Sequence, residues 1–317
     1  MKKWFGLASF LLIFGIMICV GALTACAKDL GKLDMTKYER NEHEITEDFD
    51  NIFIQTISAE ISFVLSEDGN CKVVCEEEKN LKHSVNLEEG KLFIIAIDQR
   101  KWHEHLFNFG KTSLTIYLPQ SAYALLNIQA NTGDIEIPNS FAFERVDIQV
   151  STGNVKCYAS ASENIKIKTS TGDIRLENIT TGTLDLSVST GKINVLGAVC
   201  AGDMNVNVST GDGNLTNITC KNLTSNGDTG DLSLNNVIAT EKFSIVRTTG
   251  KVEFEACDAM EIFVKTSTGK VVGTLLSEKI FIPKTSTGDI KVPDTTTGGK
   301  CEISTSTGDI KISIAGR

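Results

Sequence analysis

The chain has 317 residues, of which 41% are hydrophobic but only 7% aromatic, and its 40 acidic residues outnumber its 31 Lys and Arg. The resulting net charge of −9 argues against a nucleic-acid-binding protein, which normally presents a basic face. We therefore expect no nucleic-acid partner. The scarcity of aromatic residues favours a narrow core of aliphatic side chains.

The chain begins with a segment typical of a membrane anchor. Lys2 and Lys3 precede a run of apolar and small residues from 4 to 25, which is long enough to cross a bilayer as a transmembrane helix. Positive charge before such a span favours a cytoplasmic N-terminus. Residues 1–27 are thus predicted to hold the rest of the chain outside the membrane of a bacterial cell.

A second interpretation of this segment is a lipoprotein signal peptide. The word Leu-Thr-Ala-Cys, which ends at Cys26, matches a bacterial lipoprotein cleavage site, after which the cysteine is lipidated. The apolar region of a secretory signal usually has about 7–15 residues, and this one is longer. We favour the retained membrane span, although both interpretations tether the same domain to the membrane.

The next two segments lack the regular repeat that follows. Residues 28–44 are charged and without apolar periodicity, which predicts a spacer. Residues 45–118 show short alternating strands and a Glu89-Gly90 pair that indicates a hairpin. We interpret this second segment as an irregular β cap, because a stacked repeat needs an atypical end to protect its first open edge.

One loop of the expected cap holds a dense group of functional-looking residues, namely Trp102, His103 and His105. A His-x-His pair on a strand would aim both imidazoles to one side, so a metal is conceivable there. A binding loop with an aromatic anchor, or a plain surface loop, needs no metal. We assign no metal ligands and no cofactor to the chain.

From residue 119 to residue 317 the sequence is dominated by a repeated Thr-Gly word at intervals of 19 or 20 residues. The glycines that close the successive words are Gly133, Gly153, Gly172, Gly191, Gly211, Gly230, Gly250, Gly269, Gly288 and Gly308. Self-similarity at a fixed period of this length indicates a repeat architecture. We expect these glycines to be structural turns, since glycine takes a positive φ without steric cost.

Each repeat alternates apolar and polar residues on both sides of its turn, as strands with one buried face do. A second corner follows, at which the residue seven positions after the glycine is often apolar: Ile179, Ile218, Val237 and Leu276. A two-strand unit cannot bury its apolar face alone, whereas stacked units can. The sequence therefore predicts an all-β, single-stranded parallel β-solenoid of about ten coils, each adding about 4.8 Å. A propeller would need a period near 40 residues, and an antiparallel barrel is the runner-up.

The residues directly after the ten glycines form a predicted column of mixed charge: Asp134, Asn154, Asp173, Lys192, Asp212, Asp231, Lys251, Lys270, Asp289 and Asp309. Stacked carboxylates could bind calcium, but the lysines that interrupt the column favour a solvated ladder of weak pairs. The cysteines outside the N-terminal segment are read as buried thiols. None of them has a metal-ligand spacing with a histidine.

Two coils depart from the average repeat. Residues 211–227 place Gly213, Ser225 and Gly227 at inward positions, and the stem of Arg247, one coil later, could cover the resulting gap. The last coil, with Ile310, is followed by only a few residues that could cap it. We expect its open edge to dock a second copy of the chain or another envelope protein.

No nucleophile elbow, phosphate-binding loop, dinucleotide fingerprint or zinc-protease helix occurs in the sequence. The enzyme alternative is a carbohydrate-active β-helix, either a polysaccharide lyase or a hydrolase. Such an enzyme needs acidic and basic residues gathered on one groove face, and loops longer than these. We therefore expect a binding or scaffold module without catalytic residues.

The Ser-Thr-Gly-Asp-Ile words, the N-terminal apolar segment and the stretch "EITEDFDNIFI" resemble the putative adhesin family with β-strand repeats, over residues 45–317. These bacterial envelope proteins include the LiaG-like proteins, which are associated with cell-envelope stress. The resemblance implies a β-solenoid tethered to the membrane, with an adhesin-like role and a glycan or an envelope protein as partner. It carries over no catalytic residues.

Overall fold

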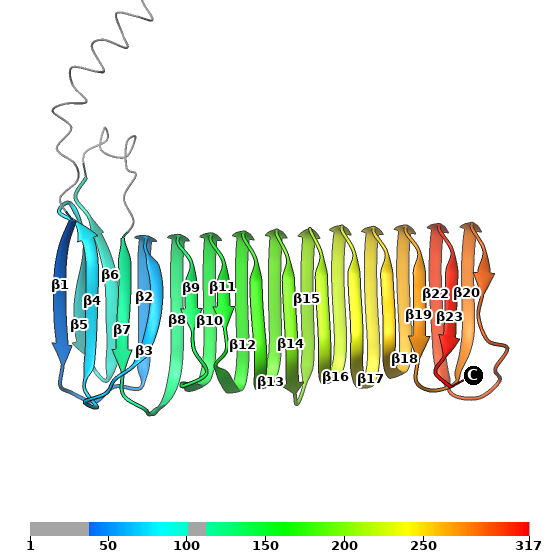
Figure 1. The fold of residues 1–317 in the computed structure, drawn as a ribbon, viewed down its shortest axis with the longest axis horizontal. Helices are drawn as coiled ribbons and strands as arrows, with labels where there is room; N and C mark the ends of the chain where they lie inside the picture. The colour runs from blue at the N-terminus through cyan, green and yellow to red at the C-terminus, as the bar shows by residue number, and fades with distance from the viewer. Residues whose placement is uncertain (1–37, 101–111, 317) are drawn as a thin grey trace, which may run out of the picture.

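The computed structural model describes residues 38–100 and 112–316, and every regular element in these ranges is a β-strand. Figure 1 shows the strands as coils that stand side by side in one row. Within the described ranges, no helix is long and apolar enough to cross a membrane. The predicted anchor of residues 1–27 and Cys26 both lie outside the described residues, as do Trp102, His103 and His105.

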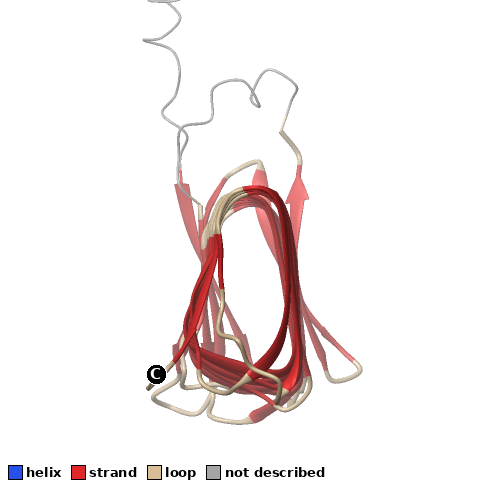
Figure 2. Cartoon of the chain, turned by 90° about the vertical axis from the view of Figure 1, so that its right-hand side faces the viewer, coloured by secondary structure: helices blue, strands red, loops and turns tan. Residues whose placement is uncertain are grey.

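Seen along the row, each coil is a narrow outline with two long sides (Figure 2). We call these sides face A and face B. Along face A the order in space is β5 (Leu81–Glu88), β6 (Lys91–Asp98), β2 (Asn51–Ser58), β8 (Ala122–Thr132), β10 (Ala142–Thr152), β12 (Ser160–Thr171), the second half of β13 (Ile174–Thr190), β15 (Asp203–Thr210), the second halves of β16 (Gly213–Thr229), β17 (Leu232–Thr249) and β18 (Val252–Thr268), then β22 (Gly299–Thr307) and β20 (Lys279–Thr287).

Face B is built by the strands that follow each turn. Its order in space is β1 (Tyr38–Ile45), β4 (Cys71–Glu78), β7 (Ser113–Leu118), β3 (Glu60–Leu65), β9 (Ile135–Ile137), β11 (Val155–Cys157), the first half of β13, β14 (Ile193–Cys200), the first halves of β16, β17 and β18, then β19 (Val271–Leu275), β23 (Ile310–Ile314) and β21 (Ile290–Lys291). Neighbouring coils pair in parallel, and the antiparallel pairs of the described residues, β1–β4, β4–β5, β4–β7 and β5–β6, all lie at the N-terminal end. The all-β solenoid of about ten coils is confirmed.

The core consists of columns of aliphatic residues that face inward from both sides. Ile135, Val155, Ile174 and Ile193 stack in register on face B, and each is almost completely buried. The alternation of buried and exposed residues along the strands follows from the two-residue period of the pleat. Each coil thus repeats the same cross-section, which explains the low aromatic content.

Close stacking of the Thr-Gly turns requires glycine there. At Gly172 the φ is +134°, and a Cβ would lie 2.0 Å from the carbonyl oxygen of Gly153 in the neighbouring coil. Gly269 does not have a positive φ, yet its Cβ would lie only 1.8 Å from the carbonyl oxygen of Gly250. Apart from Gly288 in the outermost coil, the backbone N–H of each turn glycine donates to a neighbouring coil, as Gly172 does to the Thr190 carbonyl at 3.0 Å. Steric room therefore matters at these turns as well as backbone conformation.

The second corner of the coil depends on one residue in the left-handed conformation. Asn178, Gly197, Asn217, Asn236 and Ala256 occupy this position in successive coils, with φ between 50° and 71°. Asparagine tolerates this conformation better than most residues. The apolar residue that follows is buried at three of the four expected places, namely Ile179, Ile218 and Val237.

The expectation for Leu276 is wrong, because this side chain is 44% exposed. The coil that starts at Gly269 is one residue shorter before its corner, and the pairing of β18 with β19 shifts register there. Leu275 consequently pairs with Cys257 and is buried in place of Leu276.

At the N-terminal end, residues 38–44 fall within the expected spacer but form most of β1, which pairs antiparallel with β4. The half-buried positions of β1 include Glu39, Asn41 and His43, so the strand shows no apolar alternation. Its polar groups instead find partners, as in the ion pair between Glu39 and Lys82 at 2.7 Å. The hairpin expected at Glu89-Gly90 is confirmed between β5 and β6.

The order of the last two coils in space is the reverse of their order in the chain. Strand β22 pairs with β18 on one side and β20 on the other, so the last coil lies inside the one before it (Figure 1, where the red coil lies inside the orange one). Ile310, Ile312 and Ile314 are therefore buried, and the expected open edge at this coil is wrong. The outermost coil is β20–β21. Its Pro283 has no N–H to donate, which suits an edge strand.

Candidate functional site

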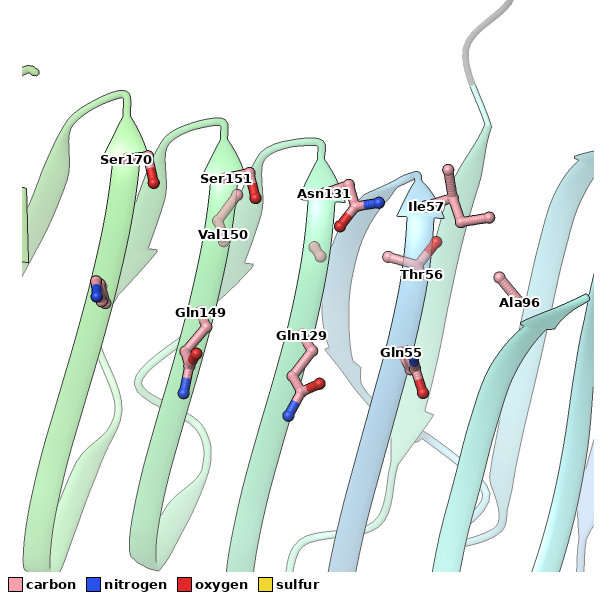
Figure 3. A pocket seen from close by; sticks show the side chains of 12 residues that line it. Gln55, Thr56, Ile57, Ala96, Gln129, Asn131, Gln149, Val150, Ser151 and Ser170 are labelled. Carbon is pink, nitrogen blue, oxygen red and sulfur yellow. The ribbon is translucent and has the colours of Figure 1, made fainter. Parts of the chain in front are cut away.

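A groove opens on face A close to the N-terminal end. Strand β6 pairs with β2 only as far as Ile95 and Gln55, and beyond this point the two strands part. The hollow has a volume of about 420 Å³ and is lined by β2, β8, β10, β12 and Ala96 of β6. Figure 3 shows this lining from close by.

The floor of the groove carries a row of amide side chains. Gln55, Gln129 and Gln149 are in register on β2, β8 and β10, and Lys168 of β12 continues the row. All four side chains point outward and are exposed, as Figure 3 shows for the glutamines. Among the residues that the structure describes, the three glutamine amides have no hydrogen-bond partner. Their donors and acceptors therefore remain available to a ligand at the coil spacing of about 4.8 Å.

A second polar row lies nearer the Thr-Gly turns, two residues further along each strand. It consists of Asn131, Ser151 and Ser170, with Ile57 at its N-terminal end (Figure 3). The two rows lie on the same side of the sheet because side chains two residues apart share a face. The groove thus presents hydrogen-bonding groups in two parallel lines.

An aromatic pair borders the glutamine row on the side away from the turns. Phe53 of β2 and Phe93 of β6 are cross-strand partners whose ring centroids lie 5.1 Å apart at an interplanar angle of 16°. Both rings are half-buried and lie on the outward side of the sheet, as does the exposed Ile95. The surface beside the groove therefore combines flat apolar area with amides.

Behind the groove, a chain of polar contacts runs into the interior. The hydroxyl of Thr56 lies 3.0 Å from Nε2 of His83, and Nδ1 of His83 lies 2.9 Å from Oε2 of Glu77. Nδ2 of Asn41 donates to the other oxygen of Glu77 at 2.7 Å. Burial lowers the pKa of His83, although the adjacent Glu77 opposes this shift. The order hydroxyl, imidazole, carboxylate is that of a catalytic triad, but Thr56 is only 3% exposed and its side chain lies on the inner side of the sheet, away from the groove.

The expected column of charged residues lies beside the turns, and its carboxylates bind backbone groups. Oδ1 of Asp173 accepts a hydrogen bond from the backbone N–H of Lys192 at 2.7 Å, and Oδ1 of Asn154 accepts one from that of Asp173 at 2.9 Å. Lys192 also forms a 3.0 Å ion pair with Asp212 in the next coil, and this pair lowers the pKa of Asp212. The column therefore links successive coils.

Sequence reasoning missed both the groove and the buried contacts behind it. Gln55 and Gln129 are 74 positions apart in the chain and meet only because β8 pairs with β2. Glu77 and His83 lie on a hairpin that carries no repeat word. The one available signal was the recurrence of glutamine four residues before the turn, at Gln129 and Gln149.

Two segments of the chain, residues 49–212 and 198–317, match the protein-family model described as Toastrack DUF4097. The chain belongs to the Toastrack DUF4097 family. The stacked coils described above are the Toastrack fold, and the expected membership of an adhesin-type repeat family is confirmed.

Solved structures similar to this Toastrack protein include one from Parabacteroides merdae described as a putative adhesin, with 12% identity and a TM-score of 0.52 over 76% of this chain and 97% of the other. A putative adhesin from Bacteroides fragilis has 15% identity and a TM-score of 0.44 over 87% and 97% of the two chains. A putative lipid binding protein from Parabacteroides distasonis has 17% identity and a TM-score of 0.47 over 75% and 95%. At such identities the likeness concerns the fold alone. No curated protein matches the chain.

Proposed function

We propose that this Toastrack protein is an adhesin-like binding module whose groove on face A holds an extended glycan of the cell envelope. The observation that carries the proposal is the row of Gln55, Gln129 and Gln149, whose exposed amides have no partner among the described residues. A row with one amide per coil suits a polymer whose hydroxyl groups repeat at a distance close to the spacing between coils. The names of the similar structures, adhesins and a lipid binding protein, agree with a binding role.

The surroundings of the amide row favour a sugar polymer over a peptide. An extended peptide gains its affinity by adding a strand to a sheet edge. Along the groove β8, β10 and β12 each have strand neighbours on both sides, and β2 lacks one only over the short stretch that follows Gln55. Phe53 and Phe93 offer flat apolar area on which a sugar ring can lie. Amides next to such a surface can donate to and accept from hydroxyl groups.

The test is binding of the full-length protein, purified in detergent, to an array of envelope polysaccharides and to insoluble peptidoglycan. The variant Gln129→Ala/Gln149→Ala should lose at least about tenfold in affinity, which corresponds to roughly 1.4 kcal/mol. The matched control is Asn207→Ala/Asn226→Ala. It removes two amides from the same column of face A, but these bond to each other at 3.1 Å and lie outside the groove.

The expected result is glycan binding that the control variant keeps and the glutamine variant loses. Absence of glycan binding by the parent protein, or equal loss in both variants, would contradict the proposal. Capture of an envelope protein through the same glutamines would show that the ligand of the groove is a protein and not a glycan. The link to envelope stress rests on the resemblance alone, and deletion of the gene followed by measurement of sensitivity to cell-wall antibiotics tests it.

We further propose that the binding module is held outside the bacterial cell membrane by residues 1–27. The basis is the sequence, in which Lys2 and Lys3 precede a long apolar run. Membrane fractionation combined with mass spectrometry of the N-terminus distinguishes the two anchors. A retained N-terminus supports the membrane span, whereas a processed chain that begins with a lipidated Cys26 supports the lipoprotein.

The proposed role is binding without catalysis. Thr56, His83 and Glu77 are arranged as a hydroxyl, an imidazole and a carboxylate, but the Thr56 side chain is directed at His83 from the inner side of the sheet. The alternative, a carbohydrate-active enzyme on the same scaffold, predicts cleavage of the bound glycan. A screen for hydrolase and lyase products, with Thr56→Val as the variant, separates the two functions.

Self-association is proposed at the outermost coil, β20–β21. Ile280, Ile282 and Ile290 are each more than 40% exposed there, and among the described strands β20 pairs with β22 alone. A strand with unpaired backbone groups can accept another strand. The exposed apolar residues favour a second copy of the chain as the partner.

A further inference from the structure

Three potential metal ligands of different chemistry meet at the N-terminal end of the solenoid. Cys75 and Glu77 are two residues apart on β4 and face inward, and His83 faces inward from β5. One ligand atom from each side chain lies within 4.8 Å of the other two. Cys75 is 0% exposed and Glu77 is 1% exposed. The hairpin between β4 and β5 brings the three together across the two faces.

The donor set indicates which ion would fit. A thiolate, an imidazole nitrogen and a carboxylate oxygen are the three ligand types that zinc takes in proteins. Calcium and magnesium prefer oxygen ligands alone, so the sulfur of Cys75 disfavours them. Three protein ligands leave a fourth tetrahedral position for a water molecule.

Neighbouring groups already hold two of the three ligands in orientation. Nδ2 of Asn41 donates to Oε1 of Glu77 at 2.7 Å, which turns Oε2 toward His83. The backbone N–H of His83 also donates to Oε2, at 2.6 Å. Nε2 of His83 lies 3.0 Å from the Thr56 hydroxyl. Hydrogen bonds of this kind to the far side of a ligand fix its orientation at metal sites.

The Thr56 hydroxyl allows the imidazole to change its tautomer when an ion enters. Without an ion, the contact between Nδ1 and Glu77 requires a proton on Nδ1, and Nε2 then accepts from Thr56. With an ion bound through Nδ1, the proton lies on Nε2 and is donated to Thr56, because a hydroxyl both donates and accepts. The imidazole stays neutral in both states.

We propose that Cys75, Glu77 and His83 form a zinc site at the N-terminal end of this solenoid. Binding converts the thiol of Cys75 to a thiolate and releases its proton to solvent, so one proton leaves per ion bound. Thr56 also belongs to the lining of the groove on face A, although its side chain is buried and contacts His83 on the inner side of the sheet. The ion would join β4 to β5, and Thr56 would join it to β2.

The experiment uses the full-length protein in detergent, stripped with a chelator and then supplied with Zn²⁺ or with Co²⁺ as a spectroscopic substitute. The expected result is about one zinc retained per chain after gel filtration, and a cobalt spectrum with a thiolate charge-transfer band. Cys75→Ser should remove the band and lower retained zinc at least about tenfold. Cys157→Ser is the control, because Cys157 is also 0% exposed but lies in an interior coil.

Two outcomes would overturn the proposal, one seen with the parent protein and one with the Cys75→Ser variant. If it retains no zinc and shows no charge-transfer band with cobalt, the site does not exist. A band that survives Cys75→Ser places the thiolate ligand elsewhere and also overturns it. Should Cys75→Ser fail to fold, Glu77→Gln replaces it, and the rise in melting temperature that zinc causes in the parent should be lost in this variant.

Discussion

The guanidinium of Arg247 occupies the space that a side chain at Gly227 would need. The two residues are cross-strand partners on β17 and β16, and a Cβ on Gly227 would lie 1.8 Å from Nη1 of Arg247. Arg247 is 1% exposed, and its Nη2 donates to the hydroxyl of Ser225 at 3.0 Å. The guanidinium group of Arg247, rather than its aliphatic stem as we expected, thus fills the gap left by the small inward residues of the coil at residues 211–227.

This relationship predicts that Gly227→Ala destabilises the protein by about 2 kcal/mol through overpacking. Arg247→Met in the same background should recover part of the loss, because it removes the contacts of the new methyl group with Nη1 and Cζ of Arg247 and leaves the 2.6 Å contact with the Val208 carbonyl oxygen. By itself Arg247→Met should be nearly neutral, since Nε and Nη1 of Arg247 have no hydrogen-bond partner within residues 38–100 and 112–316. Urea unfolding of the four proteins gives the coupling energy, and strictly additive changes would contradict the packing described here.

A second prediction compares two adjacent residues of one turn. Gly172→Val should lower the free energy of unfolding by more than about 3 kcal/mol, because it adds a clash with Gly153 to a positive φ. Asp173→Asn should change it by less than about 0.5 kcal/mol. The amide keeps the oxygen that accepts from the Lys192 N–H, as Asn154 does one coil earlier. Equal melting temperatures would disprove the role assigned to the turn glycine.

The third prediction concerns alkaline pH. Burial raises the pKa of the Cys157 thiol to about 12, from an ordinary value of 9.0. The unfolded thiol therefore loses its proton at a lower pH than the folded one, and stability falls as pH rises from about 9 toward 12. Valine at position 157 suits the aliphatic column formed by Ile137 and Leu176. Between about pH 8 and pH 10.5, the free energy of unfolding of Cys157→Val should therefore fall by about 1–2 kcal/mol less than that of the parent.

Urea denaturation at the two pH values provides the measurement. Other groups that titrate in this range are common to both proteins, so only the difference between them is informative. An identical loss of stability in the parent and in Cys157→Val would contradict the prediction.

The fourth prediction concerns the outer edge of the solenoid. Pro283→Val adds a backbone N–H to β20, which faces no further strand, and should strengthen self-association about tenfold. Light scattering of the full-length protein in detergent over a range of concentrations measures the effect. Pro138→Val, at a corner of an interior coil, serves as the control and should leave association unchanged. No difference between the two variants would show that the proline does not guard this edge.

Much of the solenoid could be predicted from local sequence. The Thr-Gly words and the alternation around them determine strands, turns and inward residues, because each coil repeats the same local chemistry. The corner at Asn178 was less visible, since a single asparagine is a weak signal. Leu276 was misplaced because one missing residue shifts the alternation by one position and exchanges inward and outward side chains.

The order of the last two coils could not be read from the repeat. Every coil ends in nearly the same word, so β22 and β20 present similar partners to β18. Particular residues favour the observed order, including Pro283, which suits an edge, and Lys279, a buried lysine that forms an ion pair with the partly exposed Asp258 at 2.7 Å. The glutamine row and the Cys75, Glu77 and His83 cluster were missed for a similar reason, because strand pairing between distant segments brings their members together.

The reversed order of the last two coils has a consequence for how such proteins change length in evolution. An interior coil, such as the one that starts at Gly172, has equivalent neighbours on both sides, so a duplicated or deleted copy of about twenty residues leaves both junctions intact. Residues 269–314 do not have this freedom, because β22 and β23 must enter between strands that precede them in the chain. We expect relatives of different length to gain and lose coils between Gly133 and Gly269, and to keep the C-terminal pair as one inherited unit.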